Sequence, residues 1–497
     1  MKRFLIISIL LICCSPLFSQ DYDPIFSPGP FMNTARMNHL AVLFPNNQLL
    51  LAGGHGTNFV SLSSAELFLS EPDTFLSLNM NYTHDVGAFA WLSDGRLLLV
   101  GGAADLGVAP GYSHAEIYEP ETGTFTAIAN MNYARNNCSA VTLTDNRILI
   151  VGGWYDVPST TYGEVFEPDS QQFSVTGALN VARALPVVLP TTDGGAVVLG
   201  GVPTYGGGVH ESVEYYDSQS NNFSVIADYI FGAEETGWSP FVCTSYNRLM
   251  ETQQLADGSY LMMAYKYVES YYEYRLFSFN PETKQFKLWD TEPQLPNSLS
   301  YGYYAPLVDA NKNVAYIPAL VSGSDPYQIK LFAVNLLDST LLIPETFCQL
   351  PANYYTSGSN FYLLHDGRIL MSGGHTQTGY NTNFSPHNQS FLITPNYTPP
   401  TSIDHEQPPQ SYDLRLMNYP NPFNNRTVFE FRLDGAQPVI LEIYDTAGQR
   451  IDRLVDQILP AGNHRFTWTA DQLASGIYYG RLTTENIRVM RKIVLIK

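Results

Sequence analysis

The clearest pattern in the sequence is an apolar run that ends in two glycines and recurs along most of the chain. It reads QLLLAGG, RLLLVGG, RILIVGG, AVVLGG and RILMSGG, with glycine pairs at 53–54, 101–102, 152–153, 200–201 and 373–374. Successive pairs begin 48, 51 and 48 residues apart, and the last follows a gap of 173 residues that fits three longer units. Inside this gap, DGSYLMMA (257–264) and NVAYIPAL (313–320) take the same place without the glycines. A regular period of this length predicts a repeat architecture, here of seven units.

Each unit has the same internal order of strands and turns. A first strand such as CSAVTL (138–143) leads through a polar turn into the glycine-terminated strand, and a variable loop follows. A third strand such as GEVFEP (163–168) and a fourth strand that opens on phenylalanine, such as FSVT (173–176), complete the unit. Four short strands with turn residues between them and no helical period predict one antiparallel blade of an all-β propeller. Over residues 24–397 the pattern resembles the kelch-repeat propellers, including their galactose-oxidase-like branch. The resemblance implies a seven-bladed kelch-type β-propeller.

The two ends of the repeat region predict how the ring closes. FSPGPFMNTAR (26–36) matches the ends of two later units, FTAIANMNYAR (125–135) and FSVTGALNVAR (173–183). The last unit, in contrast, reads QSFLITPNYTPP (389–400) and has no fourth strand of its own. We therefore expect the N-terminal strand to complete the last blade, which would leave no open sheet edge.

The first nineteen residues predict a signal peptide. Lys2 and Arg3 precede an apolar run that is too short for a permanent membrane anchor, and cleavage is expected after Ser19. A lipoprotein would use Cys13 or Cys14, but Ile12 is a poor match to the small residue required there. No later apolar stretch has the length of a transmembrane helix, so we expect an exported protein with no transmembrane segment after signal cleavage.

The C-terminal part predicts a separate module. Residues 398–412 are rich in proline and indicate a linker, and residues 413–497 contain alternating strands typical of a small immunoglobulin-like β-sandwich. YPNPF (419–423), IYDTAGQRI (443–451), LASGIYYGRL (473–482) and RKIVLIK (491–497) resemble the C-terminal sorting domain of type IX secretion cargo. This resemblance implies recognition by the type IX machinery and a secreted or outer-surface location in a Gram-negative bacterium. The final Lys-Lys pair of that family is Arg491-Lys492 here, and an accessory domain that itself binds a ligand is the alternative.

Charge and cysteine content narrow the range of partners. The 46 acidic residues outnumber the 26 basic ones and give a formal charge of −20, which disfavours nucleic acid as a partner. After signal cleavage only Cys138, Cys243 and Cys348 remain, and they lack the spacing of a zinc or redox site. We expect them to be buried apolar residues.

Residues that recur at the same place in many units are expected to serve the fold. Glutamates recur in the third strand and arginines recur before the first strand, so an ion-pair or hydrogen-bond role is favoured over catalysis by paired carboxylates. The segment DANKN (309–313) lacks the glycine and glutamate of a calcium loop and predicts a plain turn. The recurring charged residues are Glu66, Glu116, Glu164 and Glu214 with Arg36, Arg135 and Arg183.

Residues that break the repeat are the candidates for function. Loops after the second strands and links before the first strands open on one face of a propeller, and repeat-breaking residues there predict a ligand-binding site. Metal ligation by His55 and His375 is an open alternative, but the copper-oxidase set of the resembling family has no counterpart here, so no cofactor is expected. The predicted site consists of His39, His55, His84, Trp154, Tyr155, Asp156, Trp238 and His375.

Two classes of function follow. The preferred one is a secreted or cell-surface binding protein whose propeller face holds a glycan or a protein ligand, since aromatic rings provide stacking area. The alternative is an extracellular carbohydrate-active or oxidising enzyme that uses the same face.

Overall fold

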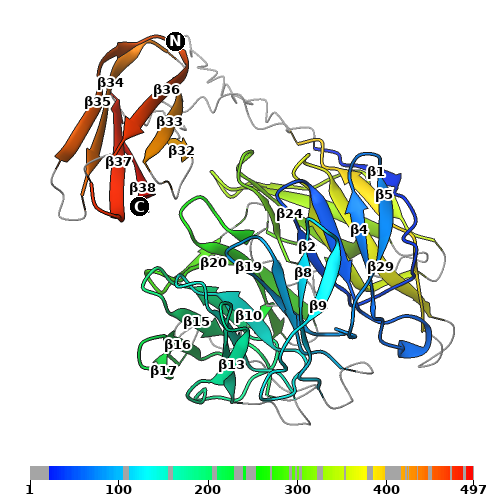
Figure 1. The fold of residues 1–497 in the computed structure, drawn as a ribbon. Helices are drawn as coiled ribbons and strands as arrows, with labels where there is room; N and C mark the ends of the chain where they lie inside the picture. Colours follow the sequence, from blue (N-terminus) through cyan, green and yellow to red (C-terminus); the bar gives the residue numbers. More distant parts are fainter. Residues whose placement is uncertain are drawn as a thin grey trace, which may run out of the picture. The chain divides into compact units, whose positions relative to one another are not determined.

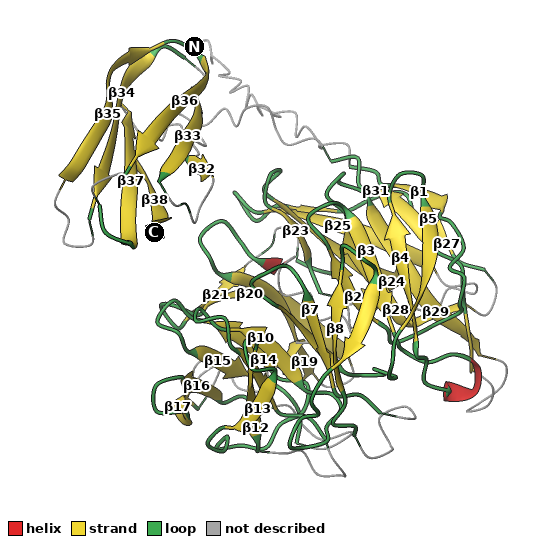
Figure 2. Cartoon of the chain, viewed as in Figure 1, coloured by secondary structure: helices red, strands yellow, loops and turns green. Residues whose placement is uncertain are grey.

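The computed structural model is almost entirely β-structure (Figure 2), and its described residues include a short 3-10 turn, η1, at Thr57–Phe59. The chain divides into two compact units, Met1–Pro399 and Pro400–Lys497, and each is described separately. The structure describes residues 22–103, 111–154, 161–203, 210–228, 239–241, 253–268, 271–289, 291, 294–296, 299–300, 305–321, 328–351, 354–377, 384–397, 416–419, 423, 425–433, 435–445, 450–470, 473–484 and 488–495.

The first unit begins with four antiparallel sheets of identical order, in which each strand pairs with the next along the chain. Sheet 1 contains β2 (Leu40–Leu43), β3 (Gln48–Ala52), β4 (Ser64–Leu69) and β5 (Thr74–Asn79); sheet 2 contains β6 (Ala88–Trp91), β7 (Leu97–Val100), β8 (Ala115–Glu119) and β9 (Thr124–Ala127). Sheet 3 contains β10 (Ser139–Thr142), β11 (Ile148–Val151), β12 (Gly163–Glu167) and β13 (Gln172–Val175); sheet 4 contains β14 (Val187–Pro190), β15 (Ala196–Leu199), β16 (Val213–Asp217) and β17 (Asn222–Ala227).

Three further sheets follow, built from longer and less regular strands. Sheet 5 contains β18 (Ser239–Phe241), β19 (Tyr260–Val268), β20 (Tyr271–Asn280) and β21 (Gln285–Trp289). Sheet 6 contains β22 (Leu299–Ser300), β23 (Leu307–Asp309), β24 (Val314–Val321), β25 (Gln328–Asn335), β26 (Leu341–Leu342) and β27 (Cys348–Gln349). Sheet 7 contains β28 (Tyr354–Leu363), β29 (Ile369–Gln377), β30 (Phe384–Pro386) and β31 (Phe391–Thr394), together with the N-terminal strand β1 (Ile25–Pro28).

Burial along each sheet explains the hydrophobic pattern of the repeat. The glycine-terminated second strands are apolar at consecutive positions because both of their faces are covered, and Leu49, Leu50 and Leu51 are fully buried. In the fourth strands β9 and β13 most residues are exposed, and only the phenylalanine is partly buried. The glycine pairs lie at positive φ, and a Cβ on Gly152 would approach the carbonyl oxygen of Arg183 to 2.4 Å, so no larger residue fits there.

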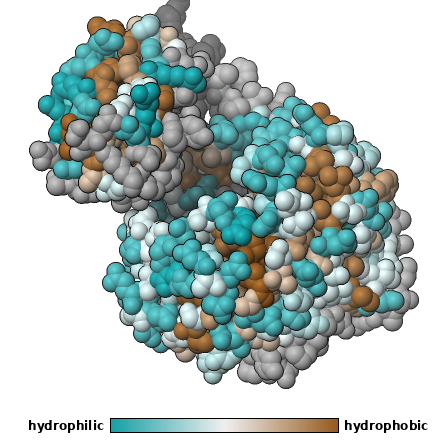
Figure 3. Space-filling view, in the orientation of Figure 1, coloured by the Kyte–Doolittle hydropathy of each residue, from teal (hydrophilic) through white to brown (hydrophobic). Residues whose placement is uncertain are grey.

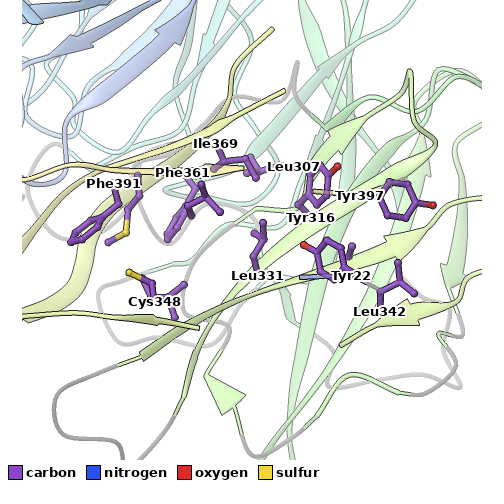
Figure 4. Close-up of a cluster of buried hydrophobic side chains, with 14 of the residues drawn as sticks. Tyr22, Leu307, Tyr316, Leu331, Leu342, Cys348, Phe361, Ile369, Phe391 and Tyr397 are labelled. Carbon is purple, nitrogen blue, oxygen red and sulfur yellow. The ribbon is translucent and has the colours of Figure 1, made fainter. Parts of the chain in front are cut away.

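Apolar side chains join each sheet to the next. Separate hydrophobic clusters form between sheets 1 and 2, 2 and 3, 3 and 4, 4 and 5, 5 and 6, and 6 and 7. Figure 4 shows the cluster of sheets 6 and 7, in which Tyr316 and Leu331 share one core with Phe361 and Phe391. A further cluster contains Leu51 of sheet 1 and Leu370 of sheet 7, so the last sheet packs on the first. This is the arrangement of a β-propeller.

The N-terminal strand belongs to the last sheet. β1 pairs with β31 in antiparallel register, from Ile25 opposite Thr394 to Pro28 opposite Phe391, and Figure 1 shows the blue strand beside the yellow ones. Tyr22, just before β1, packs edge-on against Tyr397, just after β31, with ring centroids 6.4 Å apart. The N-terminal strand and the last strand of the repeat region are therefore paired, at the place that the repeat pattern predicts.

The C-terminal unit consists of two antiparallel sheets. One contains β32 (Met417–Tyr419), β33 (Arg426–Leu433) and β36 (Gly462–Thr469); the other has the order β35 (Arg450–Leu459), β34 (Gln437–Tyr444), β37 (Gly476–Thr484), β38 (Arg488–Leu495). One hydrophobic cluster contains residues of both sheets, among them Phe429, Trp468 and Leu441. The unit therefore has a core of its own.

Candidate functional site

In sheets 1, 3 and 4 the recurring arginines and glutamates form buried ion pairs that hold the link before the sheet against its third strand. The guanidinium of Arg135 lies 2.9 Å from Glu164, and neither side chain is exposed. Glu164 also accepts hydrogen bonds from the backbone N–H groups of Asn132 and Tyr133. Equivalent pairs join Arg36 to Glu66 and Arg183 to Glu214, at 3.0 and 2.9 Å. The structural role predicted for these residues is confirmed.

In sheet 2, His84 occupies the place of the recurring arginine. Its Nε2 lies 3.0 Å from Glu116, and its Nδ1 lies 2.7 Å from the carbonyl oxygen of Gly101. Arg135 binds the equivalent carbonyl in sheet 3, that of Gly152. In both sheets the carbonyl lies 17 residues after the side chain that binds it. Burial raises the pKa of Glu116, but hydrogen bonds from His84 and Asn81 outweigh it and lower the pKa overall. His84 is fully buried and therefore belongs to the repeated ion-pair positions, which the sequence pattern did not reveal.

His55 pairs with an aspartate that the sequence pattern did not single out. Its Nδ1 lies 3.1 Å from Asp85, and both side chains are completely buried. His55 lies just after β3 of sheet 1 and Asp85 lies shortly before β6 of sheet 2, so this pair links the loops of two neighbouring sheets. The Ser61 hydroxyl lies 3.4 Å from the same carboxylate of Asp85. The other ring nitrogen of His55, Nε2, lies 3.4 Å from the side-chain amide of Asn38. Asp85 directly follows His84, and only the packing of sheets 1 and 2 distinguishes it from an ordinary turn residue.

His39 and His375 lie where sheet 7 meets sheet 1. The His39 ring is fully buried beside the hydroxyl of Ser372, at 3.1 Å. Burial, followed by the charge of Arg36, lowers the pKa of His39 to about 3, so its ring is neutral at physiological pH. His375 is 3% exposed and stacks on Tyr355 with ring centroids 5.4 Å apart.

Of the remaining predicted residues, the structure describes only Trp154, which follows β11. Trp154 is 7% exposed and its backbone forms a β-bridge with Asn136. Tyr155, Asp156 and Trp238 lie outside the described residues. The structure thus buries His39, His55, His84 and His375, of which only His375 lies in a strand, β29, and a binding role for the eight residues stays a prediction.

In the described ranges no three His, Cys, Asp or Glu side chains lie close enough together to hold a metal ion. Cys138 and Cys348 are buried in the clusters between sheets, where burial raises the pKa of the Cys348 thiol to about 11; Cys243 lies outside the described residues.

Aromatic stacks on sheets 2 and 3 are a second feature that the repeat pattern did not indicate. In sheet 2, His114 lies between two tyrosines, with its ring centroid 4.2 Å from that of Tyr82 and 5.0 Å from that of Tyr112. In sheet 3, Tyr133 and Tyr162 stack with centroids 4.5 Å apart and planes inclined by only 4°. Tyr133 is 36% and Tyr162 46% exposed. On the face drawn in Figure 3, hydrophobic residues form separate patches among hydrophilic ones.

Comparison with known proteins supports both parts of the fold. Residues 418–497 match the family described as "Secretion system C-terminal sorting domain", which confirms the sorting domain and supports export by the type IX secretion system. Among 291 matching chains of solved structures is a "Novel fungal alcohol oxidase with catalytic diversity among the AA5 family, in complex with copper". The similarity to this oxidase has a TM-score of 0.51 and 15% identity, and covers 96% of this chain and 100% of the oxidase.

At that identity the similarity shows a shared galactose-oxidase-like β-propeller fold and nothing about chemistry. No curated protein sequence matches the chain. Across the described residues, no helix has the length and apolar character needed to cross a membrane.

Proposed function

We propose that this chain is a secreted or cell-surface binding protein, exported through the type IX secretion system, with a seven-bladed kelch-type propeller as its passenger. Residues 1–19 would direct transport into the periplasm, residues 20–397 would form the propeller, and residues 398–412 would link it to an immunoglobulin-like sorting module at 413–497. The sorting-domain match at residues 418–497 is the observation that carries the proposal.

A ligand-binding role for the propeller is supported by side chains that the repeat does not require. Tyr133 and Tyr162 are exposed, whereas the corresponding residues of sheet 4 are Val181 and Ser212. Exposed aromatic rings offer flat apolar area with a polar edge, which suits a glycan or a protein ligand. The binding face would be the one on which the loops after the second strands open.

Export is tested by removing the sorting domain. A chain that lacks Pro400–Lys497 should fold, because the propeller has its own hydrophobic clusters, but should accumulate in the periplasm of a host with type IX secretion. In the converse experiment, residues 398–497 fused to an unrelated periplasmic protein should carry it to the surface or the medium. The truncated chain reaching the surface as efficiently as the full one would disprove the role of the domain.

The alternative is an extracellular oxidising or carbohydrate-active enzyme. Its support is the fold shared with a copper-containing alcohol oxidase. Metal analysis of the purified chain, before and after incubation with copper, separates the two functions: stoichiometric copper would favour the enzyme.

A further inference from the structure

The aromatic stacks defined above stand at equivalent positions of two neighbouring sheets. Tyr82 lies two positions before His84, as Tyr133 does before Arg135. His114 and Tyr162 lie two positions before Glu116 and Glu164, the glutamates that His84 and Arg135 bind. Sheets 1 and 4 have smaller, non-aromatic residues there, which are Thr34 with Ser64 in sheet 1 and Val181 with Ser212 in sheet 4.

The smaller residues show what the fold needs at these positions. In sheets 1 and 4 the hydroxyls of Ser64 and Ser212 accept hydrogen bonds from Arg36 and Arg183. The three arginines also donate to the backbone carbonyls of Ser64, Tyr162 and Ser212, so sheet 3 keeps this bond and lacks only the hydroxyl acceptor. Tyr162 itself is 46% exposed. A serine therefore satisfies the ion pair at least as well as a tyrosine, and packing alone does not account for exposed aromatic rings.

The backbone brings the two stacks next to each other. Arg135 donates its backbone N–H to Tyr112 at 2.9 Å, and Met131 donates to Ser113 at 2.8 Å. The segment that carries Tyr112 and His114 in sheet 2 therefore runs antiparallel to the segment that carries Tyr133 before sheet 3. These paired segments form an edge between sheets 2 and 3 that carries residues of both stacks.

We propose that this edge is the contact surface for a neutral glycan, whose sugar rings lie flat on the exposed tyrosines; the inference rests on the binding function proposed above. Tyr133 is 36% and Tyr162 46% exposed, so both residues offer aromatic area on which a pyranose ring can lie. The second stack would extend this surface to a neighbouring sugar. The formal charge of −20 disfavours acidic polysaccharides, so the ligand is assigned to neutral hexose chains.

The test is an array of neutral and acidic glycans probed with the purified chain from residue 20 to 497. The proposal expects binding to neutral glycans and at least a tenfold loss of affinity in the variants Tyr162→Ala and Tyr133→Ala. The Phe variants at both positions should bind within about threefold of wild type, because they keep the ring. Val175→Ala serves as the matched control, since Val175 is also in sheet 3 and 39% exposed but lies on the outer strand.

Three outcomes would overturn the inference. They are binding to acidic glycans alone, no glycan binding at all, and neutral-glycan binding that persists in Tyr133→Ala and Tyr162→Ala. Thermal unfolding of each variant is measured in parallel, and an Ala variant that unfolds early is judged by its Phe counterpart and by the variant at the other tyrosine. Export plays no part in this assay, so a refuted glycan surface leaves the sorting function intact, and a failed export experiment leaves the glycan result intact.

Discussion

The buried ion pair of sheet 3 allows a sharp test of what holds the repeat together. Glu164→Gln keeps the size of the side chain but removes its charge and replaces one acceptor oxygen by an amide that can only donate. In the wild type, Glu164 accepts four hydrogen bonds of 2.7–3.0 Å, from the backbone and side-chain amides of Asn132, the backbone of Tyr133 and the guanidinium of Arg135. The substitution leaves the guanidinium of Arg135 buried without its counter-charge.

The expected loss follows from that burial. Removal of one partner from a fully buried ion pair costs about 3–5 kcal/mol, because the remaining charge stays desolvated. Unfolding entropies near 2 cal/mol/K per residue give roughly 0.8 kcal/mol/K for a unit of about 400 residues. The melting temperature should therefore fall by about 4–6 °C.

The same strand offers a matched control. Glu167→Gln makes the same chemical change on β12, but Glu167 is 45% exposed and its distance to Arg147 is 3.8 Å. An exposed pair of this kind contributes about 0–1 kcal/mol, so this variant should melt within about 1 °C of wild type. Both variants and the wild type are compared by differential scanning calorimetry at pH 7. If the two variants melt at the same temperature, the buried pair does not stabilise the sheet as argued.

Two further predictions concern ring closure and acid stability. Deletion of residues 22–28 removes β1 and Tyr22 and exposes the edge of β31, so it should lower the melting temperature and cause concentration-dependent association. Calorimetry and light scattering measure both effects against a chain that lacks only residues 1–21. A monomer with an unchanged melting curve would contradict closure by β1. In the C-terminal unit, burial would raise the pKa of Glu442, but hydrogen bonds from Tyr444 and three arginines lower it from an ordinary 4.5 to about 2. A carboxyl with a depressed folded-state pKa stabilises above its unfolded pKa and loses that contribution as pH falls toward the folded value. Glu442→Gln should thus speed hydrogen exchange in β34 at pH 7 relative to wild type. The ratio of the exchange rates of variant and wild type should shrink as the pH falls from about 4.5 to 2, and a ratio that does not change with pH would refute the coupling.

Some features of the chain were readable because they are local in sequence. In the first four units the glycine pairs, the four-strand order and the phenylalanine near the start of the fourth strand repeat at regular intervals, since these sheets meet their neighbours in the same way. The N-terminal strand was recognisable because FSPGPFMNTAR (26–36) has the pattern of a fourth strand without the three strands that should precede it. The sorting domain was readable because several motifs occur in order within residues 413–497.

Other features depend on which side chains the sheets bring together. By its sequence pattern His84 breaks the repeat, yet it bonds the same groups as the recurring arginines, because an imidazole with two ring nitrogens reaches both a glutamate and a carbonyl. Asp85 and His55 are 30 residues apart in the chain, and only the packing of sheet 1 against sheet 2 brings them into contact.

Sequence alone therefore determined the repeat, its closure and the sorting module, because hydrophobic periodicity and turn residues act within a few residues of each other. Only the tertiary structure decided that the candidate histidines are buried and that Tyr133 and Tyr162 stack at the surface. Burial and stacking are set by register between strands and by contact between sheets, and neither is encoded in the spacing of any one segment.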